Sequence, residues 1–182
     1  MRRTALAGLG FAALLLTGCG TTVTGTASPI SSAPSGEATE PAEPTGIAGQ
    51  PCELLTPEQA TSLGYGEEGE FSPGRPEQLM PARCTWDPAA GDGDPLTAYF
   101  SVDISLADYV AGVQPDWEKD LGALTWEHYP DPLGLEGTCM LAAELSPSSF
   151  VALSSSDFLD TSKACERAEA AAPYVSANLS GG

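Results

Sequence analysis

The chain has 182 residues, with 7 basic residues, 25 acidic residues and a formal net charge of −18. This acidity argues against binding to nucleic acid, because nucleic-acid-binding proteins present basic patches. It also argues against a domain that lies flat on anionic lipid. The simplest interpretation of the charge is that acidic side chains keep the surface soluble.

The first 18 residues have the pattern of an export signal. Arg2 and Arg3 precede an uncharged, mostly apolar stretch over 4–16, which is shorter than the roughly 20 residues of a membrane-spanning helix. It ends in Leu16-Thr17-Gly18-Cys19, which resembles the bacterial lipobox. We expect removal of residues 1–18 and a diacylglycerol on Cys19 that anchors the mature protein to the outer face of the cytoplasmic membrane. An ordinary signal peptide with a chance cysteine is the alternative.

Residues 20–49 differ in composition from the rest of the chain. They are rich in Thr, Ser, Pro, Gly and Ala and contain no aromatic residue. Such a segment buries too little apolar surface to offset the entropy of ordering. We therefore expect residues 19–49 to form a disordered tether, spanning roughly 30 Å as a random coil. Residues 50–180 then form a single extracytoplasmic domain.

The first half of this domain combines one helix with a hairpin. Thr56-Pro57-Glu58-Gln59 has the pattern of a capping box and predicts a helix over 57–63 that ends at Gly64. The Gly-, Pro- and Glu-rich stretch over 66–81 indicates a loop. Strands are predicted over 83–86 and over 96–106, where apolar and polar residues alternate, and these two strands would pair across a turn.

The second half predicts more strands and a final helix. A short helix after Ser105 is followed by irregular chain, because Pro115 interrupts the pattern. Strands are expected over 124–129, 138–145 and 150–154. Asp160 caps a last helix with an alanine-rich stripe, which Pro173 should kink or divide. The expected fold is α+β: an antiparallel sheet flanked by an N-terminal and a C-terminal helix.

Four cysteines remain in the domain after Cys19 is assigned to the lipid. An even number in an exported domain predicts disulfides, with three possible connectivities. We favour Cys52–Cys84 and Cys139–Cys165, because each pair is close in sequence and ties a helix to a strand. A zinc site is the alternative, but the sequence has no Cys-x-x-Cys pair and its single histidine is His128. We expect no metal and no other cofactor.

Several of these residues together resemble a known family. Pro51-Cys52-Glu53-Leu54-Leu55-Thr56 before a helix, Cys84-Thr85-Trp86 on a strand and Cys165 in an alanine-rich final helix are similar to actinobacterial secreted lipoproteins catalogued only as a domain of unknown function. The resemblance implies a lipid-anchored extracytoplasmic domain with two disulfides. A looser similarity to the extracellular sensor domains of some mycobacterial serine/threonine kinases implies ligand sensing.

No residue pattern in the domain predicts catalysis. There is no Gly-x-Ser-x-Gly motif, and His128 in Trp-Glu-His-Tyr is expected to be structural. Asp92 and Asp94 are too few for a calcium loop and indicate a turn. Asp116, Glu118 and Asp120 are close in sequence, as the two acids of a glycan hydrolase can be, but a solvated face explains them more simply.

The aromatic residues are the remaining candidates for a site. Pockets for small molecules are mostly apolar and aromatic, and four residues are candidates to line one: Tyr99, Trp117, Trp126 and Tyr129. The alternative is that these rings build the core. We therefore expect a non-catalytic binding or interaction module for an envelope ligand or partner protein. The alternative function is a cell-envelope hydrolase that uses paired carboxylates.

Overall fold

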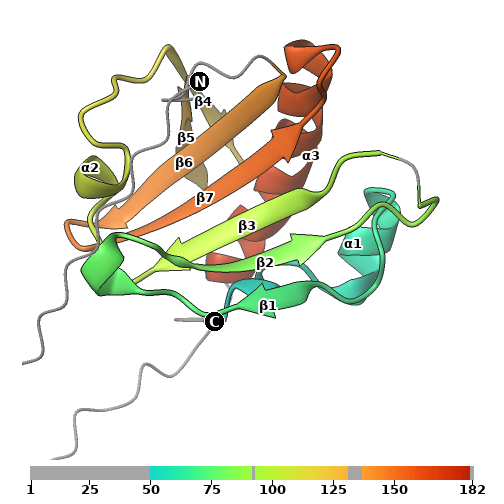
Figure 1. Cartoon of the computed structure of the whole chain (residues 1–182), viewed down its shortest axis with the longest axis horizontal. Coiled ribbons are helices and arrows are strands. Elements are labelled where there is room, and N and C mark those ends of the chain that lie inside the picture. The colour runs from blue at the N-terminus through green and yellow to red at the C-terminus, as the bar shows by residue number, and fades with distance from the viewer. Residues whose placement is uncertain (1–49, 92, 131–136, 181–182) are drawn as a thin grey trace, which may run out of the picture. The chain divides into compact units, whose positions relative to one another are not determined.

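The structure is a computed structural model that describes residues 50–91, 93–130 and 137–180. The predicted signal peptide, Cys19, the tether and Asp92 lie outside the described residues. Within them, seven strands form one antiparallel sheet in the order β1-β2-β3-β7-β6-β5-β4 (Figure 1). The α+β class expected from the sequence is confirmed.

The strands of the sheet are β1 (Glu70–Ser72), β2 (Ala82–Trp86), β3 (Leu96–Ser101), β4 (Trp117–Leu121), β5 (Leu124–Tyr129), β6 (Thr138–Ser146) and β7 (Ser149–Ser156). The helices are α1 (Pro57–Ser62), α2 (Leu106–Tyr109) and α3 (Thr161–Ser180), with 3-10 turns η1 (Pro51–Leu54) and η2 (Pro76–Gln78). Among these helices, none has the length and hydropathy required to span a bilayer.

The two faces of the sheet carry separate apolar clusters. The larger cluster lies under α3, which runs behind the sheet in Figure 1, and includes the fully buried Trp126, Leu141 and Leu153. The smaller cluster lies on the opposite face and includes Phe150 and Tyr129, with residues of the α2 segment packed on them. Other elements therefore cover part of both faces of the sheet.

Helix α3 is the main cover of the sheet. Its predicted alanine stripe is buried, and Asp160 caps its start by accepting a hydrogen bond from the Ser162 amide (3.0 Å). Of the two expected effects of Pro173, division is wrong, because α3 continues from Thr161 to Ser180 as one element, and the kink stays a prediction. Buried residues on both sides of Pro173 hold the helix on the sheet, and this packing outweighs one missing backbone hydrogen bond.

Both disulfides form as expected. Cys52–Cys84 joins η1 to β2, and Cys139–Cys165 joins β6 to α3, each with 5.0 Å between Cα atoms. Each bond therefore connects a helical element to the sheet, as the favoured connectivity requires.

Three local expectations need correction. The expected loop over 66–81 contains β1, which pairs with β2 from Glu70↔Thr85 to Ser72↔Arg83, and η2. The irregular chain expected after Pro115 contains β4, because that segment pairs with β5 across the turn at Gly122. Strand β3 ends at Ser101 and not at residue 106, because Ser101 Oγ accepts hydrogen bonds from the amides of Asp103 and Ile104 and turns the chain.

Candidate functional site

The four aromatic residues expected to line one pocket lie in different places. Trp126 is fully buried under α3, where its Nε1 donates a hydrogen bond to Ser176 Oγ (3.1 Å). Tyr129 is buried in the cluster on the opposite face. Trp117 stacks on His128 beside α3, whereas Tyr99 lines a cavity on the α2 side. The single four-residue pocket is therefore wrong, and Tyr99 belongs to a site with other partners.

The acids considered for hydrolysis do not converge on one point. Asp116 lies beside His128, with 3.3 Å between Oδ2 and Nδ1. Asp120 accepts a hydrogen bond from Thr125 Oγ1 (2.7 Å), and Glu118 lies opposite Glu127 in the β4–β5 ladder. These three acids therefore do not provide the two facing carboxylates that a glycan hydrolase needs. The calcium alternative gains no support either, because Asp94 lies 3.8 Å from the Arg167 guanidinium.

A cavity of about 520 Å³ lies where β1, β2, β3, η2 and α2 meet. Its polar lining includes Arg75, Arg83 and the two tyrosines Tyr99 and Tyr109. Leu79 and Met80 supply an apolar wall and are 49% and 39% exposed. We call this site the arginine–tyrosine pocket, defined by these six residues.

The register between β1, β2 and β3 brings together the residues on one side of the pocket. Ser72, Arg83 and Tyr99 lie directly opposite one another on β1, β2 and β3, so their side chains share the face of the sheet away from α3. Tyr109 arrives from α2, and its ring lies 6.1 Å from that of Tyr99 and 4.7 Å from that of Phe150. This row of rings fixes the tyrosine side of the pocket against the smaller core.

A closed loop forms the other wall. Arg75 and Met80 exchange two backbone hydrogen bonds of 2.7 and 3.1 Å, with η2 between them. Leu79 ends η2 in the left-handed region, with φ 55°. Gly74 is required here because an added Cβ would lie 2.7 Å from the Ala82 amide nitrogen. The loop is therefore held in shape by its own backbone, and its apolar side chains remain exposed.

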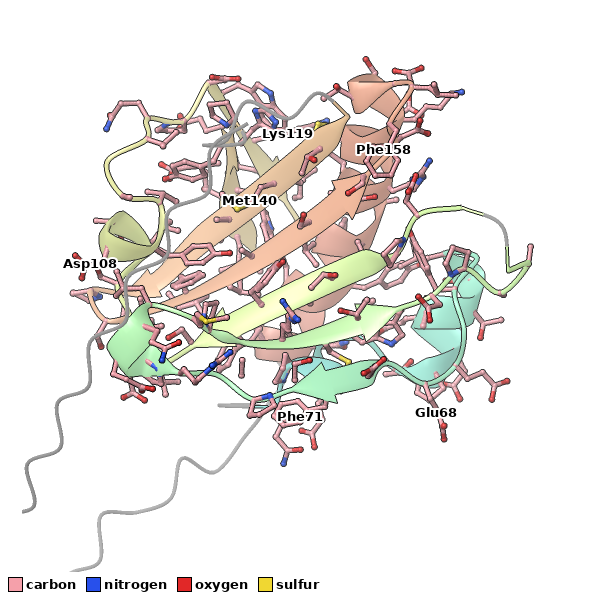
Figure 2. The ribbon with its side chains drawn as sticks, in the orientation of Figure 1. Glu68, Phe71, Asp108, Lys119, Met140 and Phe158 are labelled. Carbon is pink, nitrogen blue, oxygen red and sulfur yellow. A yellow bond between two sulfur atoms is a disulfide. The ribbon has the colours of Figure 1, made fainter. Side chains whose placement is uncertain are left out.

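The charges of the pocket contrast with those of the domain. Of the basic residues after Arg3, Lys119, Lys163 and Arg167 each form an ion pair. Arg75 and Arg83 form none with any other residue that the structure describes. Acidic side chains such as Glu68 and Asp108 project outward around the surface (Figure 2). Two guanidinium groups without a carboxylate partner among the described residues of so acidic a protein are therefore available to an external anion.

The two tyrosines remain hydrogen-bond donors over a wide pH range. Burial raises the pKa of Tyr99 and of Tyr109 above the ordinary value of 10.0, although the Arg83 guanidinium acts in the opposite direction. At neutral pH both phenols are protonated. The pocket thus combines two permanent cations, two phenolic hydroxyls and an apolar wall.

Comparison with known proteins places the chain in a family. A family model described as "Protein of unknown function (DUF3558)" matches residues 14–178. The chain belongs to this family. The match covers nearly all of the described domain of this DUF3558 member, which agrees with the resemblance carried by its cysteine motifs. No curated protein and no solved structure matches the chain.

Sequence reasoning missed most of this pocket. Arg75 lies in the stretch expected to be a loop, the pattern around Arg83 indicates only a strand, and no pattern marks Tyr109. The available signal is the scarcity of cations: only five Lys and Arg residues follow Arg3, against 25 acids. Two of these five, Arg75 and Arg83, lie eight residues apart and flank the exposed Leu79 and Met80.

Proposed function

We propose that this protein is a non-catalytic binding module, held at the outer face of the cytoplasmic membrane by a lipid on Cys19, that captures an anionic ligand in the arginine–tyrosine pocket. The observation that carries the proposal is the pair of arginines without carboxylate partners among the described residues, Arg75 and Arg83, beside an exposed apolar wall. The lipobox-like sequence and the preceding apolar stretch support the anchor.

The size and lining of the pocket favour a small molecule. Its volume of about 520 Å³ is within the range of roughly 300–1,000 Å³ that is common for ligand pockets. Guanidinium groups bind carboxylates and phosphates through paired N–H donors. Leu79 and Met80 can cover an apolar part of the same ligand. The ligand class we propose is therefore a carboxylate or phosphate attached to an apolar chain.

The anchor is tested by the mass of the protein purified from membranes of its host. We expect a mature N-terminus at Cys19 with an added diacylglycerol, and we expect Cys19→Ala to abolish this modification and release the protein from the membrane fraction. Two acyl chains hold a protein durably, whereas one holds it weakly. An unmodified N-terminus elsewhere in the chain would overturn the lipoprotein proposal, and the pocket could still be tested on the domain.

The pocket is tested with dodecyl phosphate as the probe, with binding measured by calorimetry on the full chain. We expect saturable binding by the wild type and a loss of about tenfold to a hundredfold in affinity for Arg83→Gln, because a hydrogen bond to a charged group contributes roughly 1.5–3 kcal/mol. Arg75→Gln should act in the same direction.

A matched control is Lys163→Gln, which makes the same charge change on α3, where Lys163 lies 4.0 Å from Asp160. This variant should bind dodecyl phosphate as the wild type does. Dodecanol, with the same chain and no charge, should bind much more weakly than dodecyl phosphate. Equal affinities for the two probes, or equal losses for Lys163→Gln and Arg83→Gln, would refute an anion-binding pocket.

A further inference from the structure

We propose that Cys139–Cys165 is a thiol–disulfide exchange site, at which a small external thiol opens the bond and His128 protonates the sulfur that leaves. This site lies on the α3 face of the sheet and does not depend on the arginine–tyrosine pocket. The inference rests on two features of the surroundings of this disulfide: a buried histidine and a cavity at Cys165.

His128 is a buried polar side chain without a hydrogen-bonding partner among the described residues. It is 8% exposed, and neither of its ring nitrogens forms a hydrogen bond with a described residue. Asp116 Oδ2 lies 3.3 Å from Nδ1, which is an ion-pair distance but not a hydrogen-bond alignment. Buried polar groups nearly always have partners. His128 is an exception to this rule, and it lies beside the sulfur atoms of a disulfide, where an imidazole can transfer a proton.

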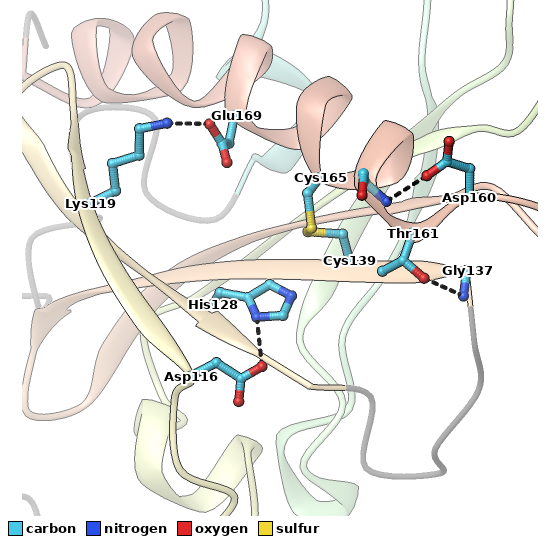
Figure 3. The surroundings of a disulfide bond; sticks show 10 residues. Asp116, Lys119, His128, Gly137, Cys139, Asp160, Thr161, Cys165 and Glu169 are labelled. Atoms are coloured by element: carbon cyan, nitrogen blue, oxygen red, sulfur yellow. Dashed lines mark hydrogen bonds and ion pairs between the residues drawn. A yellow bond between two sulfur atoms is a disulfide. The ribbon is translucent and has the colours of Figure 1, made fainter.

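The imidazole lies between the disulfide and the Asp116 carboxylate in Figure 3. One imidazole nitrogen and the sulfur atoms of Cys139 and Cys165 all lie within 4.8 Å of one another. Trp117 stacks on the imidazole, with ring centroids 5.0 Å apart and planes 4° apart, and so fixes its orientation. A small side-chain rotation after cleavage therefore brings a freed sulfur into hydrogen-bonding range of the histidine.

The disulfide is reachable from one side. A cavity of about 450 Å³ is lined by Cys165, His128 and Trp117, together with Glu166 and Glu169 of α3. Cys165 is partly exposed, whereas Cys139 is fully buried. An external thiol therefore reaches the sulfur of Cys165, and the sulfur of Cys139 becomes the leaving group.

The charged side chains near His128 and Cys165 are mostly acidic. Among the described residues, Asp116 lies beside His128, Glu166 and Glu169 line the cavity, and Lys119 is paired with Glu169.

The exchange is balanced in two steps. The external thiolate attacks Cys165 Sγ, the Cys165–Cys139 bond breaks, and the electron pair leaves on Cys139 Sγ, which takes a proton from His128. The product is a mixed disulfide on Cys165 with a free Cys139 thiol. A second external thiolate then attacks the external sulfur of the mixed disulfide, which releases an oxidised thiol dimer and leaves Cys165 as a thiolate.

The second disulfide of the same chain is an internal control. Cys52–Cys84 has no histidine beside it, because His128 is the only histidine in the sequence. The backbone at Gly69 packs on this bond, since an added Cβ there would lie 2.3 Å from Cys84 Sγ. The two bonds have the same exposure, because Cys52, like Cys165, is partly exposed and Cys84, like Cys139, is fully buried. Exchange at Cys52–Cys84 therefore reports the rate without a neighbouring histidine.

The test is reduction of the folded full chain by 2-mercaptoethanol, followed by alkylation and mass analysis of each cysteine. We expect Cys139–Cys165 to be reduced at least tenfold faster than Cys52–Cys84. In His128→Gln we expect the rate at Cys139–Cys165 to fall about tenfold, with the rate at Cys52–Cys84 unchanged. A histidine that only supports the fold predicts the opposite, because loosened packing would make both bonds react faster.

A surface variant covers the case in which His128→Gln does not fold. Asp116 has a half-exposed side chain, so Asp116→Asn should preserve the fold and slow exchange at Cys139–Cys165 severalfold. Glu118→Gln is its matched control, because Glu118 is an exposed acid two residues away. Equal reduction rates for the two wild-type disulfides, or faster exchange at Cys139–Cys165 in Asp116→Asn, would overturn the proposal.

Discussion

Replacement of Trp126 by alanine should lower the free energy of unfolding by about 3–5 kcal/mol, the range for large aromatic-to-alanine changes in a core. Trp126 is fully buried at the centre of the larger cluster. Its Nε1 donates to Ser176 Oγ, and Ser176 Oγ donates to the Leu121 carbonyl (2.7 Å). The side chain therefore joins β5, α3 and the end of β4, and its loss affects all three. Urea unfolding followed by circular dichroism measures the change.

The matched control is Trp126→Phe. Phenylalanine keeps most of the aromatic packing and removes the Nε1 donor, while Ser176 can still donate to Leu121. We expect this variant to lose less than half of what Trp126→Ala loses, since a single hydrogen bond contributes roughly 0.5–1.5 kcal/mol. Similar losses in the two variants would mean that the hydrogen-bonded chain, and not the buried volume, holds α3 to the sheet.

The elements with local chemical signals were predictable from the sequence. Thr56 and Gln59 form both hydrogen bonds of the capping box, and Gly64 adopts φ 88° after α1. Strand β5 begins at Leu124 and ends at Tyr129, as alternation indicated. The capping box is stabilised by its own neighbours in sequence, and the alternation in β5 marks which side chains face the core. Local patterns are sufficient wherever this holds.

The strands that were missed depend on distant partners. Strand β4 reads Trp117-Glu-Lys-Asp-Leu121 with three exposed charged residues at its centre, which is typical of an edge strand protected by charge. Its pairing with β5, and the contact of Lys119 with Glu169 on α3, cannot be seen in the five residues themselves. Strand β1 has only three residues and exists because β2 pairs with it.

The candidate sites were less predictable than the fold. The arginine–tyrosine pocket takes its cations from either side of η2 and its rings from β3 and α2. Its composition depends on sheet register, because Arg83 must lie opposite Tyr99. Likewise, His128 lies beside Cys139 and Cys165 only after β5, β6 and α3 have packed together. The sequence shows which residues are scarce, but it does not show which of them meet.

Removal of Cys52–Cys84 by Cys52→Ala/Cys84→Ala should lower the free energy of unfolding by about 3.5 kcal/mol, since the bond closes a loop of 32 residues. The matched control is Cys139→Ala/Cys165→Ala, whose loop has 26 residues. Loop entropy varies slowly with length, so the entropic model predicts nearly equal losses, measured by urea unfolding. A much larger loss for Cys52–Cys84 would show that η1, whose Leu54 is fully buried, needs this bond to stay packed on the sheet. A loss of under about 1 kcal/mol would contradict the assigned role of the bond.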